Sequence, residues 1–586
     1  MGGGGLFYVA DTETTARNGK QEVWLWAVIS EDGEEKIGTD IESLMKCIFT
    51  LKRVKREKVI VYFHNLKFDG SFIVNYLLSN GYTHELKAEK PRTFEVFIDD
   101  RGTWYSIIIN NKNKKVYIWD SFKKIPLSVE DIGKTYGKIS KGEIDHTLNR
   151  PTGYVPTIKE INYCLNDCRI VRIAMLEQYK HGLTSMTIGG DVLKEHKRIY
   201  GGKKVFNFLF PNLDGTDPNT GRTYDEYARK AYKGAFCWAN PKFTNQIINE
   251  KIRVYDVNSL YPYAMHSPNF YPVGIPFYGK GQPEIKENTC YIIHVLIQFN
   301  LKNNGVPCII DRNSSRFNAL SWLTSSEGAS GELEYFEMWF TNVDIELIKL
   351  NYICDIKYID FYEFEGSAQL FDTYINKYMG MKIQASKEGD KGKRQIAKLF
   401  LNNGYGKYGQ NNDCYRKKPN LNNDILEFES IKGDERATIY SPVAAFVTSY
   451  AREYTIKSCM QNIDRLLYCD TDSMHLIGDT DPTGIYVDDT ALGAWKLENT
   501  LIQGKYLRQK TYIETDTKGE YHITAGGFVK SIYINGKRYS RDYYYQHILN
   551  FTIEKFKKGL VVPNGRQTAR QTKGGIQIVN SDFTIR

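Results

Sequence analysis

Tyr468-Cys469-Asp470-Thr471-Asp472-Ser473 is the most informative stretch of this chain. Apolar residues precede it, in Ile463 to Leu467, and follow it, in Met474 to Leu476, which predicts two short strands joined by a tight turn. Two carboxylates one residue apart repel each other unless a cation lies between them. The turn is therefore a candidate site for a divalent metal, with Mg²⁺ favoured because it prefers carboxylate oxygens. An acidic turn in solvent is the alternative for this stretch taken alone.

The composition bounds the class of protein. The chain has 586 residues, 41% hydrophobic and 25% charged, which is ordinary for a large multidomain globular protein. Lys+Arg 78 against Asp+Glu 69 gives a net charge of +9, which is compatible with a polyanionic partner. The 10 Cys form no paired framework, and Cys164 and Cys168 lack the further ligands of a zinc site. We expect reduced thiols, no membrane span and no secretion, since the start from Met1 to Gly5 lacks signal-peptide features.

Four carboxylates and a tyrosine stand out in the first 185 or so residues. Asp11 and Glu13 follow a strand-like run and face the same side of it. Asp69 lies at the start of a predicted helix, where capping is the plain alternative explanation. Tyr163 and Asp167 are four apart and share one face of a later helix. Together these residues predict a two-metal phosphodiesterase site, in which Tyr163 orients or deprotonates the attacking water.

This first group resembles the DEDDy class of 3′–5′ exonucleases. The resemblance rests on Asp11 with Glu13, on Asn65-x-x-Phe68-Asp69 and on Tyr163-x-x-x-Asp167. It implies an RNase H-like domain that holds two Mg²⁺ ions, with Mn²⁺ as a substitute. It also implies that a frayed single strand is gripped nearby and that two loop residues support the site. The implied single-strand residues are Thr14, Asn65, Phe68, Ser121 and Phe122, and the supporting residues are Lys141 and Glu143, the latter as a further metal ligand.

A second group of carboxylates includes the stretch at 468–473. Arg253 to Tyr255 reads as a strand that ends in Asp256, which alone would pass for a helix N-cap. With Asp470 and Asp472 it completes three carboxylates on neighbouring strand ends. That is the minimum for holding two Mg²⁺ ions against a nucleoside triphosphate and a primer hydroxyl.

The residues from 391 to 405 supply the cations that a triphosphate needs. Basic and polar side chains recur there at steps of three and four, so they share one helical face. An ordinary amphipathic basic helix is the alternative. Lys398 together with Lys382 would form a cationic clamp, and the glycines around Tyr405 would end the helix and allow a base pair to approach. The face consists of Lys391, Arg394, Lys398, Asn402 and Tyr405.

Three motifs in order resemble motifs A, B and C of the family B DNA polymerases, and specifically the protein-primed phage enzymes of the phi29 type. They are Asp256-x-x-Ser259-Leu260-Tyr261-Pro262, Lys398-x-x-x-Asn402-x-x-Tyr405-Gly406 and Tyr468-x-Asp470-Thr471-Asp472-Ser473. The resemblance spans nearly the whole chain, and it includes Tyr232-x-Gly234-Ala235, Thr448-x-x-x-Arg452 and Lys510-Thr511-Tyr512.

The resemblance implies a role for each matching residue. Asp256 and Asp472 would ligate two catalytic metals, with Asp470 beside them and the carbonyl of Val257 as a further ligand. Tyr261 would lie beneath the incoming sugar and exclude a 2′-hydroxyl. The other implied contacts are Lys382, Lys398 and Tyr405 with the dNTP, Lys510 and Tyr512 with the primer end, and Tyr232, Gly234, Ser259, Asn402, Gly406, Thr448 and Arg452 with DNA.

The implied fold is a mixed α/β and α+β multidomain protein, an RNase H-like exonuclease followed by a right-hand polymerase with two insertions. The first insertion would help to dock a priming protein, and the second would close a ring around DNA for processivity and strand displacement. A floppy surface loop is the alternative for the second. The expected parts are the exonuclease at 1–188, the palm at 189–266 and 441–524, the insertions at 267–369 and 410–440, the fingers at 370–409 and the thumb at 525–586.

The expected activity is protein-primed, strand-displacing DNA synthesis with proofreading, by a monomer in the cytoplasm of a bacterial host. The expected partners are template and primer DNA, dNTPs, a terminal protein and viral single- and double-stranded DNA-binding proteins. A nuclease with a DNA-binding second half, or a structural DNA-binding protein on a dead scaffold, are the alternatives. Three features depart from the family pattern: Gly404 should loosen the helix end, residues 387–393 form a charged finger tip, and His146 stands where the family commonly has Tyr.

Overall fold

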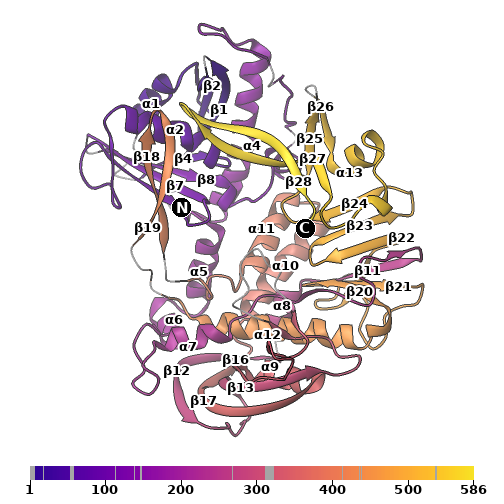
Figure 1. The fold of residues 1–586 in the computed structure, drawn as a ribbon. Coiled ribbons are helices and arrows are strands. Elements are labelled where there is room, and N and C mark those ends of the chain that lie inside the picture. The colour runs from indigo at the N-terminus through magenta and orange to yellow at the C-terminus, as the bar shows by residue number, and fades with distance from the viewer. Residues whose placement is uncertain are drawn as a thin grey trace.

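The computed structural model describes residues 7–17, 19–52, 58–112, 114–137, 139–145, 148–266, 268–310, 322–411, 414–433, 436, 438–534 and 537–586. The glycine run at the N-terminus and His146 lie outside these residues. Figure 1 shows the first part of the chain as one lobe, and the remaining parts arranged beside and below it.

The first part is built on an eight-stranded sheet in the order β3-β2-β1-β4-β8-β7-β6-β5. The central strands β1, β4 and β8 run parallel and are covered on both faces, so β4 is apolar throughout and β1 begins with the apolar run from Phe7 to Ala10. Phe7 and Val9 pack with residues of α4, whereas Tyr8 and Ala10 pack with residues of α1 and α2. The elements are β1 (Phe7–Arg17), β2 (Lys20–Ser30), β3 (Glu35–Gly38), α1 (Ile41–Thr50), β4 (Val59–Phe63), α2 (Lys67–Ser79), β5 (Thr83–His84), β6 (Thr93–Ile98), β7 (Trp104–Asn111), β8 (Lys114–Asp120), α3 (Val129–Tyr136) and α4 (Ile158–Lys180).

A second, antiparallel sheet carries the stretch at 468–473. Its main path is β24-β23-β22-β11-β21-β20-β9, and β10 pairs with β22. Helix α12 packs on this sheet through residues such as Ala451 and Ile456. The apolar run predicted as a strand from Ile463 is interrupted by the charged residues Asp464 and Arg465. Residues 463–465 form a 3₁₀ turn, and β20 begins at Leu466. The elements are β9 (Cys237–Ala239), β10 (Ile247–Ile248), β11 (Ile252–Val257), α8 (Leu260–Met265), α12 (Ser441–Met460), β20 (Leu466–Asp470), β21 (Ser473–Ile477), β22 (Trp495–Arg508), β23 (Thr511–Asp516) and β24 (Tyr521–Ala525).

Two further units flank this sheet. A four-stranded sheet in the order β12-β17-β13-β16 lies between α8 and the helix pair α10–α11 in sequence. Gly389, with φ +69°, ends α10, and Asp390 caps α11, so the chain reverses at once. The elements are α5 (Ile188–Ile199), α6 (Lys203–Leu209), α7 (Tyr224–Ala231), β12 (Phe270–Lys280), β13 (Thr289–Leu301), β14 (Ile309–Ile310), β15 (Trp322–Leu323), β16 (Phe336–Thr341), α9 (Asn342–Asn351), β17 (Tyr352–Ala368), α10 (Asp372–Glu388) and α11 (Lys391–Asn403).

Two long hairpins meet at their tips. The amide of Gly574 donates to the carbonyl of Asp424 at 3.0 Å, and Asn75 of α2 donates to the same carbonyl at 3.2 Å. Leu426 and Ile576 are buried in the core of the first part. Figure 1 shows β27 and β28 crossing to α2 and the β18–β19 hairpin. The elements are β18 (Tyr415–Asn422), β19 (Ile425–Lys432), β25 (Ser531–Ile534), β26 (Lys537–Ser540), α13 (Arg541–Tyr543), β27 (Val561–Thr572) and β28 (Gly575–Thr584).

The hairpin predicted within 410–440 is therefore present, and its tip is held by core packing rather than left as a loose surface loop.

Candidate functional site

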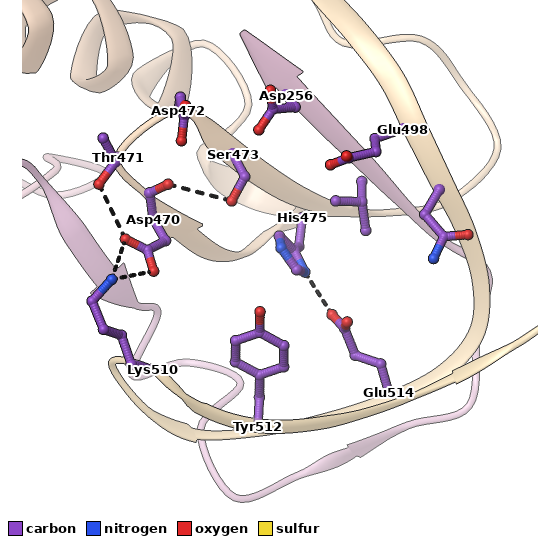
Figure 2. Close-up of a pocket in the computed structure, with 12 residues that line it drawn as sticks. Asp256, Asp470, Thr471, Asp472, Ser473, His475, Glu498, Lys510, Tyr512 and Glu514 are labelled. Atoms are coloured by element: carbon purple, nitrogen blue, oxygen red, sulfur yellow. Dashed lines mark hydrogen bonds and ion pairs between the residues drawn. The ribbon is translucent and has the colours of Figure 1, made fainter. Parts of the chain in front are cut away.

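The three carboxylates of the second group meet at one cavity of about 600 Å³. Asp256 is paired in register with Ser473, and Ser473 is paired with Asp470, so the strand ends of β11, β21 and β20 coincide. Figure 2 shows Asp256, Asp472 and Glu498 along one side of the cavity, with Tyr512 and Glu514 along the other. The lining residues are Val254, Asp256, Asp470, Thr471, Asp472, Ser473, His475, Glu498, Asn499, Lys510, Tyr512 and Glu514.

The turn between Asp470 and Asp472 is held in an uncommon conformation. Thr471 has φ +60°, a left-handed value that is costly for a β-branched residue. Neighbouring elements compensate for this cost: Thr471 donates its amide to Phe236 at 2.6 Å, and its carbonyl accepts from the Thr455 hydroxyl at 2.8 Å. The carbonyl of Asp472 accepts from the amide of Val257 at 2.7 Å. The turn is thus fixed to three other segments.

The charges in this cavity fit a divalent cation. Burial, together with Asp472 and Glu498, raises the pKa of Asp256 to about 7, although the charge of Lys398 lowers it. Burial also raises the pKa of Asp472. The ammonium of Lys510 lies 2.9 and 2.7 Å from the two carboxylate oxygens of Asp470. Among the described residues, no three acidic, His or Cys side chains are already arranged around a common metal position. The excess of carboxylates nevertheless fits the predicted Mg²⁺.

Sequence reasoning missed Glu498, His475 and Glu514. Glu498 lies on β22, the strand that pairs with β11, and its distance in sequence from Asp470 gives no hint of this proximity. In the wall of the cavity, His475 and the hydroxyl of Tyr506 each lie 2.6 Å from Glu514. This buried network supports β21 and β23. The alternation of His475 with Met474 and Leu476 in β21 was the available signal, because it places a polar side chain on a strand face.

One residue of the basic face predicted on α11, Lys398, acts on a carboxylate of this cavity. The charge of Lys398 acts on Asp256, and Lys382 of α10 donates to the hydroxyl of Ser259 at 3.2 Å. Burial, with Arg394 and Lys398, lowers the pKa of Lys382. The rings of Tyr261 and Tyr405 lie 4.7 Å apart with an angle of 31° between them. Motifs that are far apart in sequence therefore share one site. On α11, Lys391, Arg394, Lys398 and Asn402 are all exposed.

The first group of carboxylates also converges. Asp11 and Glu13 lie on β1, Asp69 in the first turn of α2, and Asp167 on α4. The hydroxyl of Thr12 donates to Asp69 at 2.6 Å. The helix begins at Lys67, two residues before Asp69, so Asp69 is not its N-cap.

Burial and mutual repulsion raise the pKa values of these carboxylates, as they do for Asp256 and Asp472. Burial, then Asp69, Asp167 and Glu13, raises the pKa of Asp11. Burial raises the pKa of Glu13 to about 8 and that of Asp69 to about 7.

One further carboxylate of this group has a free oxygen. Burial raises the pKa of Asp167, against the charge of Lys141, whose ammonium lies 2.8 Å from one oxygen. The other oxygen of Asp167, Oδ1, is buried and has no hydrogen-bond partner among the residues that the structure describes. This orphaned acceptor among mutually repelling carboxylates fits a bound cation.

Mg²⁺ is expected to raise the melting temperature by several degrees at pH 8 and by much less at pH 6. An acid whose pKa is raised from its ordinary value near 4 destabilises the folded protein as the pH rises, and the cost is complete above the raised pKa. Asp256 and Asp69 are largely protonated at pH 6 and ionised at pH 8, where a cation relieves the repulsion. Thermal unfolding in EDTA and in Mg²⁺ at both pH values checks this. The Asp256→Asn, Asp69→Asn double variant should lose most of the difference, and an equal Mg²⁺ effect at both pH values would contradict it.

The sequence model of the family described as DNA polymerase type B, organellar and viral, matches residues 50–153 and 148–487 of this chain. This chain belongs to that family. The DNA polymerase of Bacillus phage phi29 is 37% identical over 520 residues, 86% of each chain, and that of Bacillus phage Nf is 34% identical over 609 residues, 99% of each. The solved phi29 DNA polymerase superimposes with a TM-score of 0.87 at 32% identity, covering 99% of this chain and 100% of that one. Its complex with primer-template DNA and incoming nucleotide gives 0.86 over all of both chains.

The family places this chain among phi29-type DNA polymerases, enzymes of DNA replication, as the motifs predicted. The fold is likewise the expected one, an exonuclease-like domain followed by a right-hand polymerase domain. In the part of the chain that the structure describes, no helix is long and apolar enough to cross a membrane.

Gly404 in this polymerase does not loosen a helix end. It has helical backbone angles, φ −56° and ψ −39°, directly after α11. A Cβ at this position would lie 3.2 Å from the Met265 methyl and 3.3 Å from the Tyr374 ring. Glycine therefore allows α11 to pack closely against α8 and α10.

Two residues of the polymerase that were predicted to contact DNA are buried instead. Arg452 is 1% exposed, donates to the carbonyls of Lys233 and Gly234 at 2.9 Å, and is paired with Asp344 at 2.8 Å. Thr448 is 2% exposed and donates to carbonyls of its own helix. A direct phosphate contact by either side chain is not supported. Arg452 instead braces the segment at 232–235, in which Gly234 is exposed, whereas the Thr448 hydroxyl is hydrogen-bonded within α12.

Some of the residues predicted to contact single-stranded DNA in the exonuclease-like domain are exposed, and others are buried. Asn65 is exposed with φ +67°, and Phe122 is 38% exposed. Ser121 is fully buried and is hydrogen-bonded to His64 at 2.9 Å, so its direct contact with a strand is not supported. In the same domain, Thr14 and Phe68 are half-buried near the carboxylates, Glu143 is exposed on the adjoining loop, and Tyr163 is buried. In the polymerase domain, Tyr232 and Tyr512 are half-buried and Gly406 is exposed.

Proposed function

We propose that this polymerase carries out protein-primed, strand-displacing DNA synthesis and proofreads its product with a 3′–5′ exonuclease. The observation that carries the synthetic part is the convergence of Asp256 and Asp472 on one cavity, where the charge of Lys398 of α11 acts on Asp256. The proofreading part is supported by the second convergence of carboxylates, in the exonuclease-like domain. Template, primer and dNTPs are the proposed partners, because phi29 DNA polymerase has been solved with primer-template DNA and with incoming nucleotides.

In synthesis, the 3′-hydroxyl oxygen of the primer attacks the α-phosphorus of a dNTP, a new P–O bond forms, and pyrophosphate leaves. Asp256 and Asp472 would hold two Mg²⁺ ions, with Asp470 beside them and the Val257 carbonyl as a further ligand. These ions would supply charge neutralisation at the phosphates and a lowered pKa of the hydroxyl. Lys382 and Lys398 would bind the triphosphate as point charges. Lys510 and Tyr512, on the far side of the cavity, would hold the primer end.

Replacement of Tyr261 by valine should raise the use of ribonucleotides relative to dNTPs by about tenfold or more, since a lost steric block is worth at least the 1–3 kcal/mol of a pocket contact. The contact between the Tyr261 and Tyr405 rings fixes this side chain in the site. Single-nucleotide incorporation of dATP and ATP opposite the same template measures the ratio. Tyr263→Val, a change at an exposed ring on the same helix, is the control. An unchanged ratio would remove Tyr261 from sugar selection.

In proofreading, Asp11, Glu13, Asp69 and Asp167 would hold two Mg²⁺ ions that supply an activated water and clamp the scissile phosphate. Tyr163 would orient that water. Its hydroxyl stays protonated because burial raises its pKa, and the charge of Lys141 does not reverse this. The raised pKa favours a hydrogen-bonding role for the Tyr163 hydroxyl, which would hold the water in place.

The insertion at 267–369 is the proposed docking surface for a terminal protein, whose hydroxyl would replace the primer at initiation. Apolar side chains are exposed on its sheet: Ile275 is 61%, Phe277 68% and Ile353 72% exposed. Ile275 and Phe277 lie two residues apart on β12, and neighbouring exposed apolar side chains are typical of protein interaction sites. The enzyme would act as a monomer in the cytoplasm of the bacterial host, together with viral single- and double-stranded DNA-binding proteins.

Primer extension on a nicked circle, with Mg²⁺ and dNTPs and without a helicase or clamp, tests the proposed function. Products longer than the circle are expected, because the β18–β19 and β27–β28 hairpins meet at their tips and would enclose DNA. Short gap-filling products would keep the polymerase and remove strand displacement. Degradation of the primer without extension would favour a nuclease whose second half only binds DNA.

A variant in which a short Gly-Ser turn replaces residues 415–432 should fill gaps yet make products shorter than one circle. The hairpin contributes no residue to the cavity of the palm, so the chemistry should persist while the polymerase dissociates early. Product lengths under single-encounter conditions with a heparin trap measure this. Products as long as those of the unaltered enzyme would show that the hairpin is not needed for processivity.

A further inference from the structure

Arg150 makes an unusual number of buried contacts near the exonuclease-like site. Its guanidinium donates through Nε and Nη2 to one carboxylate oxygen of Glu160, at 3.0 and 2.9 Å. Nη2 also donates to the carbonyl of Asp145 at 2.8 Å, and Nη1 donates to the carbonyl of Leu148 at 3.1 Å. The group lies 4.2 Å from the ring centroid of Trp24, and Arg150 is 2% exposed. None of these hydrogen-bond partners belongs to the catalytic machinery proposed above, although the charge of Arg150 also lowers the pKa of Glu13.

These contacts join two segments of the chain. Asp145 and Leu148 belong to a loop in which residues 139–145 and 148–150 form neither helix nor strand, so side chains must fix its course. Glu160 belongs to the first turn of α4, where its other oxygen accepts from the amide and the hydroxyl of Thr157 in a capping box. The planar fork of arginine suits this task, because it can address a carboxylate and two carbonyls in fixed directions.

The two segments meet again at the carboxylates. From the loop, the ammonium of Lys141 lies 2.8 Å from Asp167 and 5.4 Å from the ring centroid of Tyr163. A Cβ on Gly142 would lie 3.4 Å from the Tyr163 ring. Tyr163 and Asp167 lie one and two turns after Glu160 on α4, so the helix transmits its position rigidly. Movement of the loop along α4 would therefore displace Lys141 from both residues.

We propose that Arg150 is a positioning residue for the exonuclease: it clamps the loop residues 139–145 and 148–150 to the start of α4 and thereby sets Lys141 against Asp167 and Tyr163. This inference rests on the proposed proofreading function. Its partner in the clamp is Glu160, and Trp24 on β2 is the surface against which the guanidinium is stacked. The clamp lies outside the palm, so it has no part in synthesis.

Three variants test the clamp: Arg150→Met, Arg150→Lys, and Arg150→Met combined with Glu160→Gln. The last leaves no unpaired buried charge and keeps the capping box, which accepts Gln as well as Glu. Arg169→Met is the matched control, because Arg169 makes a two-pronged pair with Glu35 at 2.6 and 2.8 Å from the same helix, half-exposed and away from the loop. Degradation of single-stranded DNA and extension of a paired primer are measured for each.

We expect all three variants to degrade single-stranded DNA about 10- to 100-fold more slowly, the usual cost of removing a residue that orients a catalytic group. The loss should lie in kcat rather than KM, and primer extension should stay within twofold. Arg169→Met should behave as the unaltered enzyme. Amide hydrogen exchange at residues 139–145 should quicken in Arg150→Met, and this holds without metal or DNA.

Two results would overturn the proposal while the proofreading function stands. One is an exonuclease rate in folded Arg150→Met equal to that of the unaltered enzyme. The other is recovery of the rate in the double variant, which would show that an unpaired charge caused the loss. If the unaltered enzyme degrades no DNA, the proofreading function itself fails, and the inference fails with it.

Discussion

Replacing Asp256 by alanine is expected to abolish DNA synthesis while degradation of single-stranded DNA continues. Asp256 lies at the end of β11 and shares the cavity with Asp472, and its pKa of about 7 reports how strongly the neighbouring carboxylates and burial oppose its charge. A bound cation would relieve that opposition while the carboxylate stays ionised. Loss of the carboxylate should remove a proposed metal position, which we expect to slow nucleotide addition by at least about 10³-fold, the upper cost of one electrostatic stabiliser.

Primer extension with a single dNTP, sampled from milliseconds to minutes, measures this loss. The protein should remain folded, because removal of a carboxylate with a raised pKa relieves repulsion at pH 8. Asp479→Ala is the control, since that side chain is 69% exposed on a loop of the same domain. If Asp256→Ala lost exonuclease activity as well, the assignment of the two activities to two separate sites would be wrong.

The double substitution Asp11→Ala, Asp69→Ala is expected to have the opposite effect. Asp11 lies on β1 and Asp69 in the first turn of α2, and both pKa values are raised above the ordinary range by burial. Without them, the proposed metal positions of the exonuclease lose two of four carboxylates. We expect degradation of single-stranded DNA to fall by at least about 10³-fold, with synthesis on a paired primer unchanged.

A primer with a mismatched 3′ end gives the clearest measurement. The unaltered enzyme should remove the mismatch before extending, whereas the double variant should extend it slowly and retain the wrong base. Glu42→Ala, at a side chain 63% exposed on α1, controls for a general effect on this domain. Normal repair of the mismatch by the double variant would place proofreading elsewhere in the molecule.

Local sequence patterns predicted much of both sites, because each motif is a short strand or helix end whose chemistry is complete within a few residues. The 3.6-residue period exposed the basic face of α11, and the carboxylates at the ends of β11 and β20 were visible as acids after apolar runs. The hairpin between β18 and β19 was also visible as two polar strands, although its buried tip was not.

The tertiary structure decided which polar residues face the sites and which support them from within. Arg452 and Ser121 were predicted to contact DNA. Both are buried, and their side chains are hydrogen-bonded to other residues of the protein. Glu498 joins the palm carboxylates, and Arg150 joins the loop to α4, although neither belongs to a recognisable motif. The physical reason is that burial and charge pairing depend on which strands and helices pack together, and such long-range packing leaves no trace in local residue order.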